Sequence, residues 1–208
     1  MPLALFPFFM IKQIIGLTGG IATGKSTVSR YLEEKYKLPI YDADIIARQA
    51  VDKGSPILKK ISDRYGQDIL NQNGELNRSQ LGEIIFNQPT EKQWLEQQIH
   101  PFVKNYFIEQ IQQTNEPFII LVIPLLFEAK MTDLVTQIWV VTCSLEQQIY
   151  RLINRNNLTL TQAKTRINNQ IPLAEKIKQA DIVLDNQGIL EDLHSQIDQV
   201  MSSKFYKS

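Results

Sequence analysis

The feature that most constrains this chain is a glycine-rich segment directly after a short run of β-branched residues. The eight residues Gly19–Ser26 read GGIATGKS and match G-x-x-x-x-G-K-[ST] at every fixed position. Glycines allow backbone N–H groups to converge on phosphate oxygens, and a following helix adds the positive end of its dipole. The strand-like run Gln13–Leu17 precedes the motif, and the helical spacing of Gly24–Lys35 follows it. The sequence therefore predicts a phosphate-binding loop for a nucleoside triphosphate.

The side chains of this loop predict separate roles towards a bound nucleotide. Lys25 can reach the β and γ phosphates, and the hydroxyl of Ser26 can coordinate Mg²⁺, which makes Ser26 the expected metal ligand. The residues expected to hold the nucleotide here are Gly20, Ala22, Thr23, Gly24, Lys25, Ser26 and Thr27.

Further along the chain, apolar runs alternate with segments of helical periodicity. Four more runs are predicted strands: Leu38–Tyr41, Phe118–Pro124, Gln137–Cys143 and Asp181–Leu184. The second and third of these are almost continuously apolar, which is typical of strands that helices cover on both faces. Strands separated by helical segments indicate βαβ units. We therefore predict an α/β fold with a doubly wound, five-stranded parallel sheet of the P-loop NTPase type.

Composition narrows the class of protein and its partners. The chain has 208 residues, with 22 Lys and Arg against 22 Asp and Glu, and a formal net charge of zero. This balance argues against non-specific binding of nucleic acid, which uses a basic surface to displace counterions. A single cysteine, Cys143, excludes an intramolecular disulfide framework. We expect a cytoplasmic protein with small-molecule substrates, without nucleic-acid or membrane partners, that is a monomer or weak homo-oligomer.

The first ten residues, Met1–Met10, are strongly apolar. They have no basic segment and no small-residue cleavage site of the kind that a signal peptide carries. They are also far shorter than the ~20 residues that span a bilayer. We therefore expect an apolar N-terminal extension at residues 1–10, with Met10 as a candidate natural start.

The phosphate-binding motif alone does not choose among nucleotide-binding proteins. A GTPase needs an NKxD motif to read the base, and none occurs; the DxxG match at Asp185–Gly188 lies near the C-terminus, too late in the chain to serve as a switch. A motor ATPase is usually larger and carries an apolar run that ends in paired acids. A small-molecule kinase is therefore favoured. The alternatives are another kinase of this kind, such as one acting on a nucleoside monophosphate, and a nucleotide-binding module without catalysis.

Two carboxylates follow the second predicted strand, in the segment Tyr41-Asp42-Ala43-Asp44. In an open parallel sheet, ligands bind at the carboxyl ends of the strands, so Asp42 is expected in the same crevice as the loop. Phosphoryl transfer to a hydroxyl requires a group that orients the acceptor and takes its proton, and we choose Asp42. Asp44 would hold Mg²⁺ through water or cap the next helix. Simple helix capping by both residues remains the alternative.

Several motifs together resemble the dephospho-CoA kinase family. The segments LTGGIATGKSTV and YDADIIARQAV carry the resemblance, with further matches at His100-Pro101, Pro124–Glu128 (PLLFE) and Asp185–Gly188. The GKST element is common to many NTPases, whereas DADxIAR and PLLFE in this order are much more diagnostic. The resemblance covers roughly Ile11 to Val200, and so describes the whole predicted fold.

The resemblance implies ATP-dependent phosphorylation of the ribose 3′-hydroxyl of dephospho-CoA, giving CoA and ADP, the final step of CoA biosynthesis. It implies one domain over residues 11–208, with a core (about 11–44, 114–150 and 176–208), a helical CoA-binding region (about 45–113) and a small helical lid (about 151–175). The catalytic residues would be Asp42, Lys25 and the lid residue Arg155. Arg151 and Asn186 would contact ATP, with Arg166 a weaker lid candidate. The substrate would contact Asp44, Arg48 and His100.

The sequence also departs from the family pattern. Many members carry an acid two residues before Pro124, where this chain has Val122. Magnesium would then depend on Ser26, the ATP phosphates, water, and Asp44 or Glu128. A helix-breaking turn is an alternative explanation for His100-Pro101. Cys143, Trp94 and Trp139 are interpreted as packing residues.

Overall fold

The computed structural model describes residues 12–205 of the chain, so the extension expected at residues 1–10 lies outside it. The described residues form two compact units. We call the first the sheet unit; it consists of the residues up to Ile40 and those from Thr114 onwards. The second, the helical unit, is Tyr41–Gln113. No helix in residues 12–205 has the length and apolar character needed to cross a membrane.

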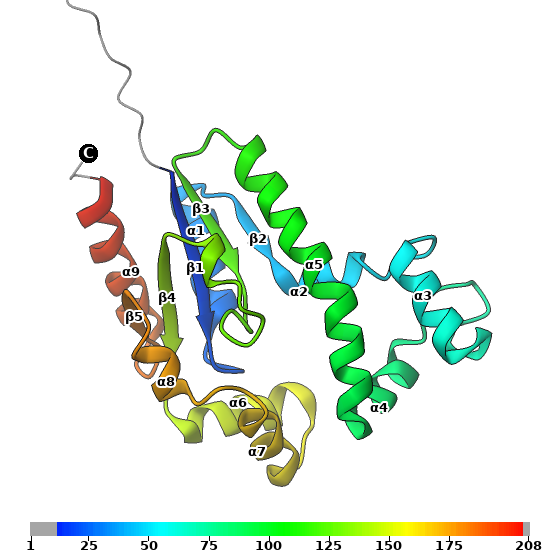
Figure 1. Cartoon of the computed structure of the whole chain (residues 1–208). Coiled ribbons are helices and arrows are strands. Elements are labelled where there is room, and N and C mark those ends of the chain that lie inside the picture. Colours follow the sequence, from blue (N-terminus) through cyan, green and yellow to red (C-terminus); the bar gives the residue numbers. More distant parts are fainter. Residues whose placement is uncertain (1–11, 206–208) are drawn as a thin grey trace, which may run out of the picture. The chain divides into compact units, whose positions relative to one another are not determined.

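Five strands form one parallel sheet, as the sequence predicts (Figure 1). Their bounds are β1 Gln13–Gly19, β2 Ile40–Asp42, β3 Phe118–Val122, β4 Gln137–Thr142 and β5 Ile182–Asp185. The order across the sheet is β2-β3-β1-β4-β5, so β1 lies between β3 and β4. In this register Ile15 is opposite Ile120 on one side and Gln137 on the other. The chain therefore leaves the central strand, β1, directly into the glycine-rich loop.

Helices occupy the predicted intervals between the strands. In the sheet unit they are α1 Lys25–Tyr36, α6 Leu145–Asn156, α7 Leu160–Asn168, α8 Leu173–Ile177 and α9 Leu190–Phe205, with a 3₁₀ turn, η2, at Thr132–Leu134. In the helical unit they are α2 Ala43–Gln49, α3 Pro56–Tyr65, α4 Arg78–Asn87 and α5 Pro89–Gln113, with η1 at Gln67–Ile69.

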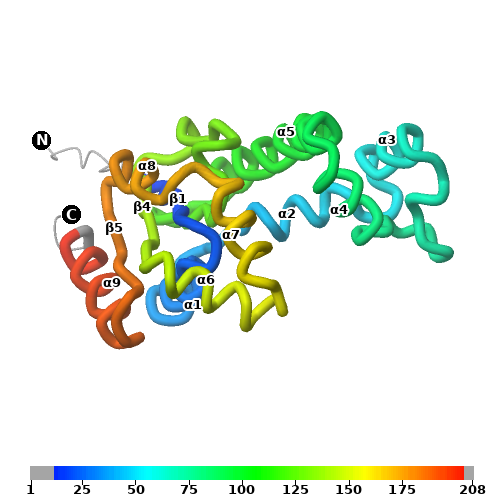
Figure 2. Tube along the Cα trace, turned by 90° about the horizontal axis from the view of Figure 1, so that it is seen from below, coloured from blue at the N-terminus to red at the C-terminus, as the bar shows by residue number. Residues whose placement is uncertain are grey.

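Both faces of the sheet are covered, which explains the nearly continuous apolar strands. Helices α1 and α9 lie on one face and α8 on the other (Figure 2). On the first face, buried apolar residues of the helices pack against alternate residues of the strands; they include Val28, Leu32, Leu193, Ile197, Leu17, Ile120 and Trp139. On the other face, Gly16 lies against the side chains of Val135 and Leu126. The packing role predicted for Trp139 is confirmed.

The helical unit has a separate apolar core, which includes Ile61, Ile69 and Leu81. Trp94 packs at its edge, edge-to-face with the ring of Tyr65, as predicted for a packing residue. The turn considered at His100-Pro101 is wrong, because α5 continues through Pro101 to Gln113. Proline removes its own N–H from the helical ladder and its ring crowds the carbonyl group of the preceding turn, so a proline inside a helix costs stability. Helix α5 packs against both α2 and α4, and this packing offsets the cost of the proline.

Candidate active site

The loop between β1 and α1 adopts the concave backbone that a phosphate group requires. Ala22 and Gly24 both have left-handed φ angles, 61° and 108°. Alternation of left-handed and right-handed residues turns successive N–H groups towards one point, forming an anion-binding nest. A Cβ at Gly24 would overlap the side-chain amide of Asn186, so this position needs glycine for space as well as for conformation. The predicted loop is therefore present with the expected local geometry.

Lys25 begins α1 and folds back over the loop. Its Nζ donates to the carbonyl oxygens of Gly20 at 2.8 Å and of Gly19 at 3.4 Å. The dipole of α1 gives its N-terminal end, next to this ammonium group, a partial positive charge. Ser26, the next residue, is exposed in the first turn of α1. A lysine, a helix N-terminus and a hydroxyl thus meet at one point, which suits a polyphosphate and its metal ion.

The side chains of Arg151 and Asn186 donate hydrogen bonds to carbonyl groups of the loop. Arg151, on α6, donates from Nη1 to the carbonyl oxygens of Ala22 at 3.3 Å and of Thr23 at 3.2 Å. Its Nη2 donates to the carbonyl oxygen of Asn186 at 3.0 Å, and Asn186 Nδ2 donates to that of Thr23 at 2.8 Å. The structure therefore brings these two predicted residues to the loop, where they hold its carbonyl groups.

Two glutamines also contact the loop, and the sequence interpretation assigned neither a role. Gln148 Nε2 donates to the carbonyl oxygen of Ile21 at 2.8 Å, and Gln170 Oε1 accepts from the backbone N–H of Ile21 at 2.8 Å. Gln148 lies three residues before Arg151, so helical spacing alone puts both on one face of α6. Gln170 follows the end of α7 and has no comparable signal in the sequence.

The predicted lid arginines lie on exposed parts of α6 and α7. Arg155 is in the last turn of α6, and its Nε donates to Asn156 Oδ1 at 3.0 Å. Arg166 is exposed in the last turn of α7. Helices α6 and α7 contact each other, and both lie beyond the carboxyl ends of β1 and β4 (Figure 1). The side chain of Arg155 thus contacts the neighbouring residue Asn156, and its role in binding the phosphates of ATP stays a prediction.

Asp42 ends β2 and caps α2. Its Oδ1 accepts from the backbone N–H of Asp44 at 2.8 Å, so the capping interpretation is confirmed for Asp42. The carboxylate is only partly buried. The capping bond uses one of the two side-chain oxygens of Asp42, and the role of Asp42 as the base that takes the proton of the acceptor stays a prediction.

The three residues predicted to contact the substrate lie in the helical unit. Asp44 and Arg48 are exposed in the first and last turns of α2, and His100 is half-buried on α5.

The residues around the loop fit a magnesium ion held mainly by the nucleotide. Within residues 12–205, no group of three or more His, Cys, Asp or Glu side chains could hold a metal ion. Val122 is buried in β3 and cannot coordinate one. Glu128 Oε1 is paired with Lys176 Nζ at 2.9 Å. The exposed hydroxyl of Ser26 suits the preference of Mg²⁺ for few protein ligands beside phosphate and water, and the roles considered for Asp44 and Glu128 stay predictions.

Cys143 is buried at the end of β4, and burial raises the pKa of its thiol above the usual range. Its neutral thiol agrees with the predicted packing role.

Comparisons with known proteins agree along most of the chain. A family model described as dephospho-CoA kinase matches residues 13–192. The dephospho-CoA kinase of Synechocystis is 59% identical over 187 residues, which covers 89% of this chain and 93% of the relative. That of Trichormus variabilis is 57% identical over 189 residues, covering 91% and 96%. A solved structure of dephospho-CoA kinase from Campylobacter jejuni is 30% identical, with a TM-score of 0.69 and coverage of 92% and 96%.

Proposed function

Since this chain belongs to the dephospho-CoA kinase family, we propose that Lys25, Asp42 and Arg155 carry out its phosphoryl transfer. The function of the chain is the ATP-dependent phosphorylation of dephospho-CoA to coenzyme A, with ADP as the second product. The observation that carries the nucleotide half of this reaction is the loop Gly20–Gly24, held in its left-handed turns with Lys25 over its carbonyls.

The acceptor oxygen is the ribose 3′-hydroxyl of dephospho-CoA. In the proposed reaction this oxygen attacks the γ-phosphorus of ATP, and the bond to the bridging β–γ oxygen breaks, releasing ADP. Asp42 orients the hydroxyl and takes its proton. Supporting this role, Asp42 ends a strand of the same sheet whose central strand leads into the loop. Its capping bond with Asp44 also fixes the direction of the carboxylate.

Charge on the transferred phosphoryl group is proposed to be balanced from several sides. Lys25 exchanges its bonds to the loop carbonyls for the β and γ phosphates. Ser26 would hold Mg²⁺, which neutralises charge on the β and γ phosphates. Arg155 would reach the phosphates when α6 and α7 act as a lid and exclude water.

Substrate binding and location complete the proposal. We assign the acceptor contacts to Asp44, Arg48 and His100, all in the helical unit. The cytoplasm is the proposed location, because ATP is produced there and a free thiol such as that of Cys143 stays reduced.

The test is an ADP-release assay of the purified chain with ATP and Mg²⁺ and one acceptor at a time. We expect release with dephospho-CoA, phosphate on the 3′-oxygen by NMR, and a background rate with AMP or without acceptor. Turnover on AMP but not on dephospho-CoA would indicate a nucleoside monophosphate kinase. Nucleotide binding without ADP release with either acceptor would indicate a non-catalytic module.

The base assignment predicts a specific kinetic defect for Asp42→Asn. Asparagine can still cap α2 through its side-chain oxygen but cannot take the proton. We expect kcat to fall about 100-fold or more while KM changes little. Asp63→Asn is the matched control, because it neutralises an exposed carboxylate of α3 that has no proposed role in the reaction, and it is expected to leave kcat unchanged. An Asp42→Asn variant with nearly native kcat refutes the assignment.

A further inference from the structure

Ile21, in the middle of the phosphate-binding loop, has both of its backbone polar groups held by glutamine side chains. Gln148 donates to its carbonyl oxygen and Gln170 accepts from its N–H, each at 2.8 Å. Gln148 is in α6, and Gln170 follows α7. The segment between them, 148–170, is therefore attached at both ends to a single residue of the loop.

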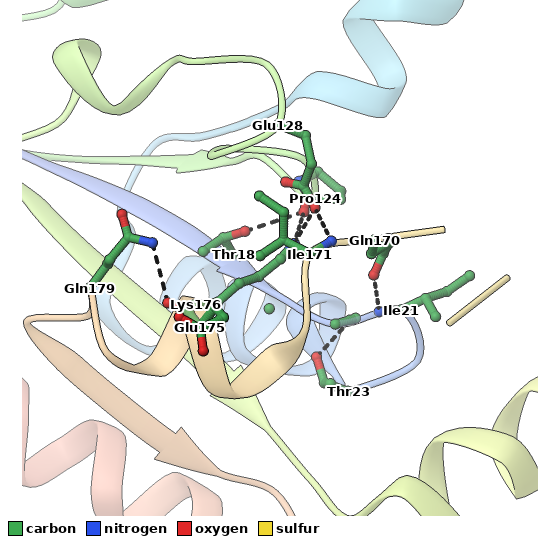
Figure 3. Close-up of polar contacts among 12 residues, drawn as sticks. Thr18, Ile21, Thr23, Pro124, Glu128, Gln170, Ile171, Glu175, Lys176 and Gln179 are labelled. Carbon is green, nitrogen blue, oxygen red and sulfur yellow. Dashed lines mark hydrogen bonds and ion pairs between the residues drawn. The ribbon is translucent and has the colours of Figure 1, made fainter. Parts of the chain in front are cut away.

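The backbone beside Gln170 is itself fixed to the segment that follows β3 (Figure 3). The N–H of Ile171 donates to Glu128 Oε1 at 3.0 Å. The same oxygen pairs with Lys176 Nζ at 2.9 Å, and Nζ also donates to the carbonyl oxygen of Pro124 at 3.2 Å. Gln170 thus extends to the loop from an anchored backbone.

The anchor resists displacement because it contains a buried charge. Lys176 is fully buried, and Glu128 Oε1 is its ion-pair partner. Removing one member of a buried ion pair leaves an uncompensated charge in a low-dielectric environment. The bond from Gln170 to Ile21 is a single neutral hydrogen bond, and it is weaker than the ion pair of the anchor. If the loop shifts, one of two things must therefore happen. Either segment 148–170 moves with the loop, or the hydrogen bond between Ile21 and Gln170 breaks.

We propose that Gln170 is a positioning residue that couples the phosphate-binding loop to segment 148–170. Nucleotide binding then sets the conformation of α7 and of the part of α6 that carries Arg155, through Ile21. The inference rests on the proposed function, because it requires a nucleotide at the loop.

The test is backbone hydrogen exchange of the full chain, with and without a non-hydrolysable ATP analogue. Gln170→Met keeps a similar side-chain length and removes the acceptor. Gln179→Met is the matched control, since it removes a side-chain bond to the carbonyl oxygen of Glu175 at the other end of the anchored stretch. We expect the analogue to protect both 19–26 and 160–168 in the wild type and in the control. In Gln170→Met only 19–26 should gain protection.

A kinetic readout separates coupling from simple support of the fold. Loss of one hydrogen bond is expected to lower kcat by about 2- to 10-fold. KM for ATP should change less than kcat, and the melting temperature should stay close to that of the wild type. Gln170→Asn has a side chain too short to reach Ile21, so it should show the same fall in kcat with a nearly unchanged melting temperature. It replaces Gln170→Met in the test if that variant does not fold.

The outcomes distinguish this inference from the function on which it rests. If the analogue fails to protect residues 19–26 of the wild type from exchange, both the proposed function and the coupling are refuted. If it protects 19–26 but 160–168 respond alike in Gln170→Met and the wild type, the coupling alone is refuted. A wild type in which 160–168 do not respond at all refutes it equally.

Discussion

At the scale of single residues, Glu128, which ends the motif PLLFE, forms an ion pair with Lys176 that the sequence did not indicate. Glu128, a candidate partner for magnesium in the sequence, uses its Oε1 to accept from both Lys176 and the backbone of Ile171. Its Oε2 is buried without a hydrogen-bond partner. A carboxylate in these surroundings depends on the lysine for compensation of its charge.

We therefore predict that Lys176→Met lowers the free energy of unfolding by about 3–5 kcal/mol. The double variant Glu128→Gln with Lys176→Met should recover part of this loss, because no uncompensated charge remains. Chemical denaturation measures both. Lys178→Met is the matched control, since its pair with Glu175 is exposed, 69% and 51% at the two side chains, and should cost less than about 1 kcal/mol. An equal loss in both lysine variants contradicts the prediction.

At the scale of secondary structure elements, a cluster of polar side chains joins α1 to α9. Asp198 of α9 accepts from Lys35 Nζ at 2.7 Å, from the hydroxyl of Tyr36 at 2.7 Å and from that of Tyr31 at 2.9 Å. The ring of Tyr31 also stacks on His194, with centroids 3.7 Å apart. Because α1 follows directly after the phosphate-binding loop, this cluster fixes the end of the helix that is far from the loop.

Burial of Asp198 would by itself raise the pKa of its carboxyl group. The hydrogen bonds from Lys35, Tyr36 and Tyr31 together outweigh that effect, and the pKa is lowered. The folded state thus favours the charged form. The stability that the carboxylate contributes is therefore present above the unfolded-state pKa of about 4 and is lost as the pH falls below it.

The corresponding prediction concerns Asp198→Asn. At pH 7 it should reduce the free energy of unfolding by about 1 kcal/mol, since the side chain of Asp198 is 34% exposed and solvent screens part of the interaction. The difference from the wild type should shrink below about pH 4, where the wild type also loses the charge. Urea denaturation at pH 7, 5 and 3 checks this. Tyr36→Phe, which removes one donor, should give a smaller loss. A difference that grows as the pH falls contradicts the assignment.

At the scale of the whole molecule, residues 12–205 include one apolar core in the sheet unit and another in the helical unit, and each unit contains one tryptophan. Trp139 is buried in the sheet unit, and Trp94 packs in the helical unit. The hydrogen bonds that brace the phosphate-binding loop, from Gln148, Arg151, Gln170 and Asn186, all come from the sheet unit. ATP binding should therefore stabilise the sheet unit most directly.

We predict that ATP at 100 times its Kd raises the unfolding free energy reported by Trp139 by about 2.7 kcal/mol. Trp94→Phe isolates this fluorescence signal. Trp139→Phe isolates the signal of Trp94, which should shift less. Denaturation with and without ATP measures both. Equal shifts would mean that the two units unfold as one cooperative body.

The strands, the helices and the phosphate-binding loop were predictable because their signals are local. Apolar runs identify strands that are covered on both faces, and G-x-x-x-x-G-K-S encodes a left-handed turn before a helix. The resemblance of the motifs to a family extended this to the reaction. Prediction was wrong where distant contacts override a local preference, as at Pro101, where α2 and α4 support the continuing helix.

The sequence by itself determined the fold class, the nucleotide loop and the family, since each depends on residues close together in the chain. Only the tertiary structure decided what surrounds the loop. Arg151 holds carbonyl groups of residues about 130 positions away, and Gln170 meets Ile21 across a separation of 149. Glu128 meets Lys176 only because folding brings α8 to the segment that follows β3. Hydrogen bonds and ion pairs of this kind form where folding brings side chains together, and no local pattern in the chain records them.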